Sequence, residues 1–396
     1  MNSQRSMASR RAVLAMLGAA PVAAGAVLAA PGVAGAGAAG QGHIPKELRP
    51  GGEYDKAVAQ FAAEDTFSGT VLLAHRGKPV LERAYGMADK AKSIPNRMDT
   101  LFSVGSICKA FTSVAVMQLA RQDKIDLHAT VGTYLDGFRA EVADTVTVHQ
   151  LLTHTGGMGD HGADSRAWDS VEEVFEGTLD VIRGRQDLPE FTPGTEWRYS
   201  NSGFHILGAI VRAASNEDYY KYIREHVFDP AGMERTGFYT RPQVLAADDI
   251  AHPYATHPQT GERIDSTTRD DFPFVGTPAG GAFSTAEELM KFIRALHEDG
   301  TLLPSAFADL ATNGKAVQGP DQRPDLVRQN SFYGYGFEVT TLNDRRICGH
   351  SGGSSIGVSC MLDFHPALDW VSVSLSNYSD RYWPLVNLER TLITQQ

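Results

Sequence analysis

Cysteine is scarce in this chain of 396 residues, and its scarcity limits what can hold the fold together. Only Cys108, Cys348 and Cys360 are present, so a framework of several disulfides is excluded. Cys348 and Cys360 flank a predicted hairpin, where a bridge between directly opposed strand positions would be strained. With 42% apolar residues, the chain can instead bury a full hydrophobic core, in one large domain or two ordinary ones.

Positive charge is also in deficit. The formal net charge is −11 at neutral pH, which argues against phosphate backbones and anionic surfaces as partners. We therefore expect a small-molecule or peptide substrate, and no nucleic acid.

Long apolar runs are missing except at the N-terminus. There Arg10 and Arg11 precede an Ala, Val, Leu and Gly stretch that reaches about Ala30, which is typical of a twin-arginine export signal. A membrane anchor is the alternative, but Pro21, Pro31 and many small residues make the stretch weakly apolar for a stable span.

Small residues at 34–38 form Ala-x-Ala steps, which predict signal cleavage just after them. The mature chain would then begin near Ala39 and would have lost Arg5, Arg10 and Arg11, giving a net charge of −14. We expect a secreted or extracytoplasmic protein with no stable membrane span after signal removal.

Strand patterns occur near both ends of the chain, and helical patterns fill the middle. A hairpin is predicted over 69–85, and alternating or continuous apolar runs predict further strands near the C-terminus. The predicted strands are 333–340, 345–348, 356–363 and 370–376; the predicted helices start at Ser106, 171, 204 and 383. This order favours an α/β (α+β) fold, with one antiparallel sheet built from both chain termini, flanking helices and an inserted all-helical domain. The predicted domains are a signal peptide at 1–38, an α/β domain at 39–105 and 271–396, and a helical domain at 106–270.

Ser106 and Lys109 form the one Ser-x-x-Lys in the sequence. On a helix, positions i and i+3 share a face about 5–6 Å apart, so the ammonium group can reach the hydroxyl. Desolvation of Lys109 among Ala110, Phe111 and other apolar neighbours would favour its neutral form, which can accept the serine proton. A solvated lysine beside a capping serine is the alternative.

Tyr199 and Asn201 follow a turn-rich loop and precede another apolar helix. A phenol can relay a proton to a leaving group and an amide can hold a substrate carbonyl, two roles that a Ser-Lys pair does not fill. The Tyr-x-Asn pattern is uninformative by itself.

His350, Ser351 and Gly353 lie in Gly-His-Ser-Gly-Gly, between two predicted strands. Backbone N–H groups at such a strand edge can hold an oxyanion or a peptide. The same residues match Gly-x-Ser-x-Gly, the nucleophile elbow of α/β hydrolases, which makes Ser351 a rival nucleophile. An elbow requires a following helix and a later acid and histidine, whereas strand follows here and few residues remain.

Taken in order, Ser106-x-x-Lys109, Tyr199-x-Asn201 and His350-Ser351-Gly352 resemble the motifs of the serine β-lactamase and penicillin-binding superfamily, in its class C β-lactamase and DD-peptidase branch. Segments 151–157 and 278–285 look like further parts of that branch, so the resemblance covers about 55–395. It implies a β-lactamase/transpeptidase-like fold and an enzyme that needs no cofactor and no metal.

By this resemblance Ser106 is the acylated nucleophile, and Lys109 and Tyr199 share general-base and general-acid duty. Asn201, His350, Ser351 and Gly353 would bind substrate, and the N–H groups of Ser106 and Gly353 would form the oxyanion hole. His350 stands where β-lactamases usually carry lysine, which argues against an efficient β-lactamase. The arginine that holds a substrate carboxylate in DD-carboxypeptidases is missing from 336–340, although Arg345 or Arg346 could substitute.

The sequence therefore predicts an exported serine hydrolase of peptide or amide bonds, with D-residue peptides related to cell-wall stem peptides as the favoured substrates, by a D-Ala-D-Ala carboxypeptidase-like or D-aminopeptidase-like activity. A carboxylic-ester hydrolase and a weak β-lactamase are the alternatives within the fold. A non-catalytic peptidoglycan or β-lactam sensor is the alternative of another class, and it predicts loss of Ser106, Lys109 or Tyr199. Metal-dependent hydrolysis would use residues that lack a recognised ligand spacing, namely His149, His154, His161 and Asp160.

Overall fold

The computed structural model describes residues 44–161, 168–318, 326–379 and 382–396. The predicted signal peptide and its cleavage site lie outside the described residues. Ile44–Gln396 forms one compact unit. Within the described ranges, every helix is too short or too polar to span a bilayer.

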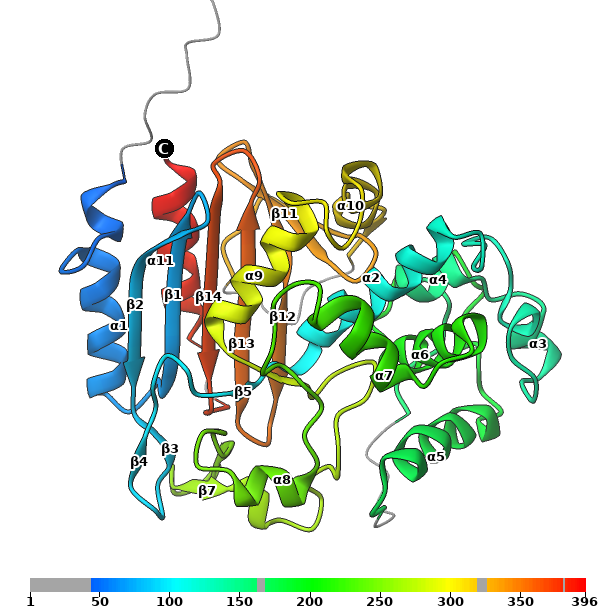
Figure 1. The fold of residues 1–396 in the computed structure, drawn as a ribbon, viewed down its shortest axis with the longest axis horizontal. Coiled ribbons are helices and arrows are strands. Elements are labelled where there is room, and N and C mark those ends of the chain that lie inside the picture. The colour runs from blue at the N-terminus through cyan, green and yellow to red at the C-terminus, as the bar shows by residue number, and fades with distance from the viewer. Residues whose placement is uncertain (1–43, 162–167, 319–325, 380–381) are drawn as a thin grey trace, which may run out of the picture. The chain divides into compact units, whose positions relative to one another are not determined.

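The centre of the fold is an eight-stranded antiparallel sheet (Figure 1). In spatial order its strands are β2 (Lys78–Tyr85), β1 (Gly69–His75), β14 (Trp370–Ser376), β13 (Val358–His365), β12 (Arg345–Ser354), β11 (Glu338–Leu342), β10 (Asn330–Tyr333) and β9 (Ala316–Val317). β1 pairs with β14 along its whole length, from Gly69 opposite Ser376 to His75 opposite Trp370. The predicted sheet built from both chain termini is thereby confirmed.

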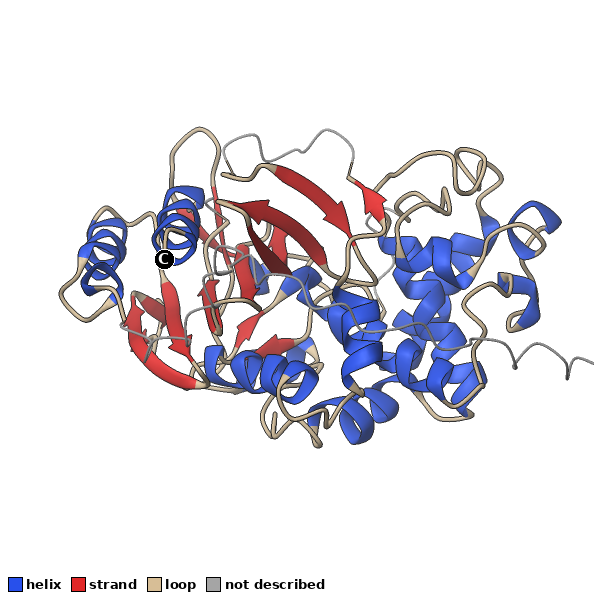
Figure 2. Cartoon of the chain, turned by 90° about the horizontal axis from the view of Figure 1, so that it is seen from above, coloured by secondary structure: helices blue, strands red, loops and turns tan. Residues whose placement is uncertain are grey.

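Alternate residues of each strand enter two separate cores, as strand geometry requires. Val71 and Leu73 pack with α1 (Glu53–Ala63) and α11 (Trp383–Thr394), whereas Leu72 packs on the opposite face with α9 (Ala286–His297) and the remaining helices. Figure 2 shows the strands between these two groups of helices. The sheet is covered on both faces, which explains why most of its central positions are apolar.

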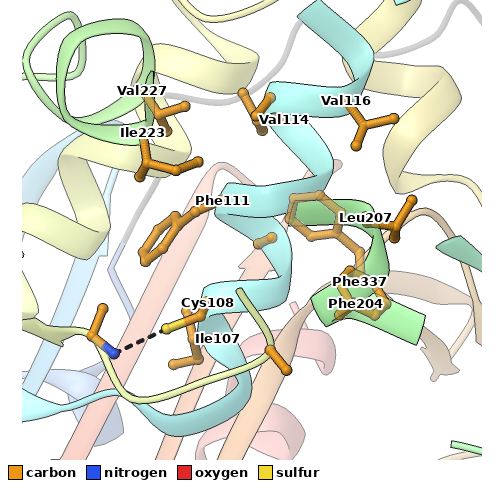
Figure 3. Close-up of a cluster of buried hydrophobic side chains, with 14 of the residues drawn as sticks. Ile107, Cys108, Phe111, Val114, Val116, Phe204, Leu207, Ile223, Val227 and Phe337 are labelled. Carbon is orange, nitrogen blue, oxygen red and sulfur yellow. Dashed lines mark hydrogen bonds between the residues drawn. The ribbon is translucent and has the colours of Figure 1, made fainter. Parts of the chain in front are cut away.

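A buried helix, α2 (Cys108–Arg121), runs through the core on the α9 side of the sheet. Phe111 on this helix contacts Phe228 and Phe292 edge-on, with ring centroids 5.0 and 4.9 Å apart. Figure 3 shows α2 side chains meeting those of neighbouring helices.

The remaining described α-helices are α3 (Ala140–Ala143), α4 (Val148–Leu152), α5 (Val171–Gly184), α6 (Asn201–Ser215), α7 (Tyr219–Ile223), α8 (Arg241–Ala246) and α10 (Ser305–Thr312). Three short strand pairs lie outside the eight-stranded sheet: β3 (Met87–Asp89) with β4 (Ile94–Pro95), β5 (Phe102–Ser103) with β8 (Phe283–Ser284), and β6 (Tyr254–Thr256) with β7 (Arg263–Asp265).

Two sequence-based expectations need correction or completion. The predicted strand 333–340 is wrong, because β10 ends at Tyr333 and β11 begins only at Glu338. Between them Gly336 has φ +71°, and a Cβ there would lie 2.6 Å from the carbonyl oxygen of Lys109, so the turn requires glycine. Cys348 and Cys360 do not face each other across the hairpin, and the three cysteines are free and buried.

Candidate active site

Ser106 lies in a short 3-10 helix, Gly105–Ile107, that leads directly into α2. Here the chain approaches β12 closely: a Cβ on Gly352 would lie 2.3 Å from the carbonyl oxygen of Val104 and 3.1 Å from the nitrogen of Ser106. A Cβ on Gly105 would lie 3.1 Å from the nitrogen of Gly353. Glycines therefore let the backbones of Ser106 and Gly353 come together, which is the approach that the predicted oxyanion hole needs.

Lys109 extends from the first turn of α2 toward Ser106 and is fully buried. Its Nζ lies 3.2 Å from Ser106 Oγ, 2.7 Å from Asn201 Oδ1 and 2.6 Å from the carbonyl oxygen of Ala279. Burial lowers the pKa of Lys109 to about 7, because a desolvated ammonium group is disfavoured. The predicted helical pairing of Ser106 with Lys109 thus has the geometry of a hydrogen bond.

The three acceptors around Lys109 also orient its lone pair. The oxygens of Asn201 and Ala279 can only accept hydrogen bonds, so a neutral amine keeps its two N–H groups on them. Its lone pair then points toward the remaining neighbour, the hydroxyl of Ser106, which can donate. The arrangement is suited to moving the serine proton onto Lys109.

Asn201 is the first residue of α6, a position fixed by Ser200, whose hydroxyl accepts the N–H of Gly203 at 2.9 Å. The amide of Asn201 donates from Nδ2 to Asp160 Oδ2 at 3.0 Å while its Oδ1 faces Lys109. These two contacts fix which way the amide is turned.

Tyr199 packs against Lys109 and a buried histidine, His154. Lys109 Nζ lies 4.7 Å from the centroid of the Tyr199 ring, and the His154 ring lies 4.5 Å from it. His154 Nδ1 accepts the backbone N–H of Ser200 at 3.1 Å. Burial, with the charges of Lys109 and His350, holds the pKa of His154 well below its usual range, so the imidazole is neutral and can accept. His154 therefore positions the Tyr199–Asn201 segment.

His350 and Ser351 lie within β12 and have different surroundings. His350 is buried, its Nε2 lies 2.8 Å from the hydroxyl of Tyr333, and its ring centroid lies 6.4 Å from that of Tyr199. Ser351 donates from Oγ to Glu338 Oε1 at 2.8 Å. Because Ser351 lies inside a strand, it lacks the strand-to-helix turn that a nucleophile elbow requires.

An open strand edge lies next to these residues. β11 begins at Glu338, which lies opposite Gly349, and among the described residues no strand pairs with the following part of β12 on that side. An extended substrate can add there as a further strand.

A cleft of about 430 Å³ opens beside Ser106. Its polar residues include Ser106, Asp160, His161 and Asn201, and the glycines at 280, 281 and 353 also line it. Aromatic and aliphatic side chains complete it, among them Tyr239, Val244, Phe272, Phe283 and Ile356. Among the described residues that line the cleft, Asp160 is the one acid, and no lysine or arginine is present.

The four residues considered as metal ligands contact other protein groups, although His161 Nδ1 and Asp160 Oδ1 also lie 3.8 Å apart. His149 Nδ1 lies 2.8 Å from the hydroxyl of Tyr335, and His161 Nδ1 lies 3.4 Å from Ser202 Oγ. His154 accepts the backbone N–H of Ser200. Asp160 instead belongs to the cleft, a role that sequence reasoning missed because a single aspartate in a loop carries no motif. Sequence reasoning also misses the carbonyl of Ala279, although this residue lies in segment 278–285, which is part of the resemblance.

Comparison with known proteins agrees with this geometry. The Beta-lactamase family model matches residues 54–391. Penicillin-binding protein 4* of Bacillus subtilis (strain 168) is 28% identical over 72% of this chain, which spans only 63% of that protein. Esterase EstB of Burkholderia gladioli is 27% identical over 84% of this chain and 92% of its own.

Among solved structures, the penicillin-binding protein from Bacillus halodurans has a TM-score of 0.72 and 25% identity, over 84% of this chain and 98% of its own. The fold, the Ser-Lys pair and these matches point to one conclusion: the chain belongs to the Beta-lactamase family of serine hydrolases.

Proposed function

We propose that the protein is an exported serine hydrolase that cleaves peptide or amide bonds of D-residue peptides through an acyl-enzyme on Ser106. Both a D-Ala-D-Ala carboxypeptidase-like and a D-aminopeptidase-like activity fit this class, with peptides related to cell-wall stem peptides as the proposed natural substrates. The observation that carries the proposal is the 3.2 Å contact between Ser106 Oγ and Lys109 Nζ, with the pKa of Lys109 lowered to about 7.

In the proposed acylation, neutral Lys109 takes the proton of Ser106 while Oγ attacks the substrate carbonyl. The N–H groups of Ser106 and Gly353 hold the oxyanion. Tyr199 relays the proton to the leaving amine, which departs as the carbonyl re-forms. In deacylation, water attacks the ester with Lys109 and Tyr199 as the base, and Ser106 regains its proton.

A carboxylic-ester hydrolase is the second candidate. EstB, an esterase by name, matches this chain over nearly its whole length, and ester cleavage uses the same acyl-enzyme with an easier leaving group. A weak β-lactamase is less well supported, because His350 replaces the usual lysine. A non-catalytic sensor is disfavoured by the presence of Ser106, Lys109 and Tyr199 together.

The test is covalent labelling of the mature protein with a fluorophosphonate and, separately, a fluorescent penicillin, followed by intact mass and peptide mapping. We expect a fluorophosphonate adduct on Ser106, none in Ser106→Ala, and an unchanged adduct in Ser351→Ala. Labelling by penicillin as well would favour the D-Ala-D-Ala carboxypeptidase-like activity. Labelling by fluorophosphonate alone would favour the D-aminopeptidase-like activity or the esterase. An adduct on Ser351, or none on the wild type, would refute the proposal.

A further inference from the structure

Asp160 lies beside Asn201, a predicted substrate-binding residue. Its Oδ2 accepts from Asn201 Nδ2 at 3.0 Å, and its Oδ1 lies 3.8 Å from His161 Nδ1. The Asp160 side chain is still 57% exposed and lines the cleft beside Ser106. It can therefore accept further hydrogen bonds from a molecule bound there.

Arg185 holds the loop that carries Asp160 through a hydrogen bond to its backbone. The Arg185 guanidinium donates to the backbone oxygen of Asp160 at 2.6 Å and is itself held by Asp187 and Glu190. Arg185 thus contacts the backbone oxygen of Asp160 and not its carboxylate. The negative charge of Asp160 is left directed at the cleft.

This charge changes what Asn201 can bind. An amide carbonyl of an N-acylated substrate needs a donor, but one N–H of Asn201 Nδ2 is already given to Asp160, and the carboxylate repels a carbonyl oxygen. A substrate ammonium group, in contrast, would donate to the carboxylate in a charge-assisted bond, which is stronger than a neutral one. The apolar lining, including Phe272 and Phe283, would accept the rest of the acyl group.

We propose that Asp160 is a specificity-determining residue that selects substrates with a free, protonated amine on the acyl side of the scissile bond and rejects N-acylated ones. This inference rests on the proposed function, because it assumes that the acyl group of the substrate binds beside Ser106. It assigns the substrate class as D-amino-acid amides, esters or peptides with a free N-terminus.

The test is calorimetric binding of D-phenylalanine amide and N-acetyl-D-phenylalanine amide to Ser106→Ala protein, which cannot turn either over. We expect the free amine to bind at least about tenfold more tightly, as one charge-assisted contact allows. Adding Asp160→Asn, which keeps an oxygen for Asn201, should bring the two affinities within about twofold, and Asp160→Glu should restore part of the preference. Asp144→Asn removes the same charge from an exposed site outside the cleft and should leave the preference intact.

Equal affinities for the two amides, no binding of the free amine, or a preference that survives Asp160→Asn would each overturn the inference. None of these results bears on whether Ser106 is acylated, because that is decided by the labelling of the wild-type protein. Conversely, unlabelled Ser106 together with an Asp160-dependent preference would refute the proposed catalysis while keeping the amine site.

Discussion

Lys109 and Arg390 are both fully buried cations, yet the structure treats them in opposite ways. Lys109, on the α2 side of the sheet, meets only neutral acceptors within hydrogen-bond distance, and burial lowers its pKa to about 7. Arg390, on α11 and the other side, is held by both oxygens of Asp363 at 2.6 and 2.9 Å. Burial alone would lower the pKa of Arg390, but the charge of Asp363 outweighs it and the pKa is raised.

The contrast shows that burial alone does not decide what a cation does. A carboxylate in direct contact locks the charge of Arg390 and makes it part of the core. Lys109 has no carboxylate within hydrogen-bond distance among the described residues, and its pKa of about 7 is close to neutral pH. A general base requires a pKa in this range. A buried cation therefore contributes to the core on one face of the sheet, and on the other face Lys109 has the properties that the proposed general base needs.

Replacing the lysine should have the largest effect on activity. Lys109→Met is expected to lower kcat/KM for p-nitrophenyl acetate by about a thousandfold, within the range found for loss of a positioned base. Lys109→Arg should be equally inactive, because a guanidinium group does not deprotonate in proteins. Initial rates measure the loss, and circular dichroism checks the fold; an active arginine variant would contradict the role of Lys109 as base.

Replacing the arginine should affect stability and not catalysis. Arg390→Met leaves Asp363 buried without its partner and should cost about 3–5 kcal/mol in the free energy of unfolding. Urea denaturation measures this loss, and kcat per folded molecule should stay the same. The double variant Arg390→Met/Asp363→Leu should recover much of the stability, and failure to recover any would show that the pair contributes more than its charges.

The acidity of Lys109 should appear in the pH dependence of the reaction. The neutral amine is the active form, so kcat/KM should rise with pH through a midpoint near 7, the pKa to which burial lowers Lys109. Asp160 and Glu338 both raise this pKa by their charge, so Asp160→Asn should move the midpoint to lower pH. A pH profile on p-nitrophenyl acetate, which lacks an amine, measures the shift without the effect of substrate charge; a midpoint that moves upward would contradict it.

The parts of this picture that the sequence predicts are those with a periodic or local cause. The hairpin at 69–85 follows from two strand runs around a short turn, the strand at 370–376 follows from alternation, and the Ser106–Lys109 contact follows from helical spacing. The break between β10 and β11 escaped because its cause is tertiary: the turn glycine Gly336 lies against the backbone of Lys109, far away in sequence.

The same limit applies within the candidate site. Asp160 and Ala279 reach Asn201 and Lys109 across 41 and 170 positions of the chain, and a loop carboxylate or a backbone carbonyl has no pattern of its own. The motifs predict which residues react. Their polarisation and orientation depend on partners that only the folded chain brings together.

The smallest expected effect concerns His154, which positions Tyr199 without being placed to react. His154→Phe keeps a ring among Tyr199, Phe204 and Tyr333, which lie 4.5, 5.2 and 4.4 Å from it, but removes the acceptor for the Ser200 N–H. A buried donor left without a partner costs about 1–3 kcal/mol, and relaxation of the loop would displace Tyr199. We expect kcat to fall about threefold to tenfold with KM little changed, whereas His154→Gln, which can still accept, should lose less. Equal losses in both variants would mean that the ring, and not its hydrogen bond, holds Tyr199 beside Lys109.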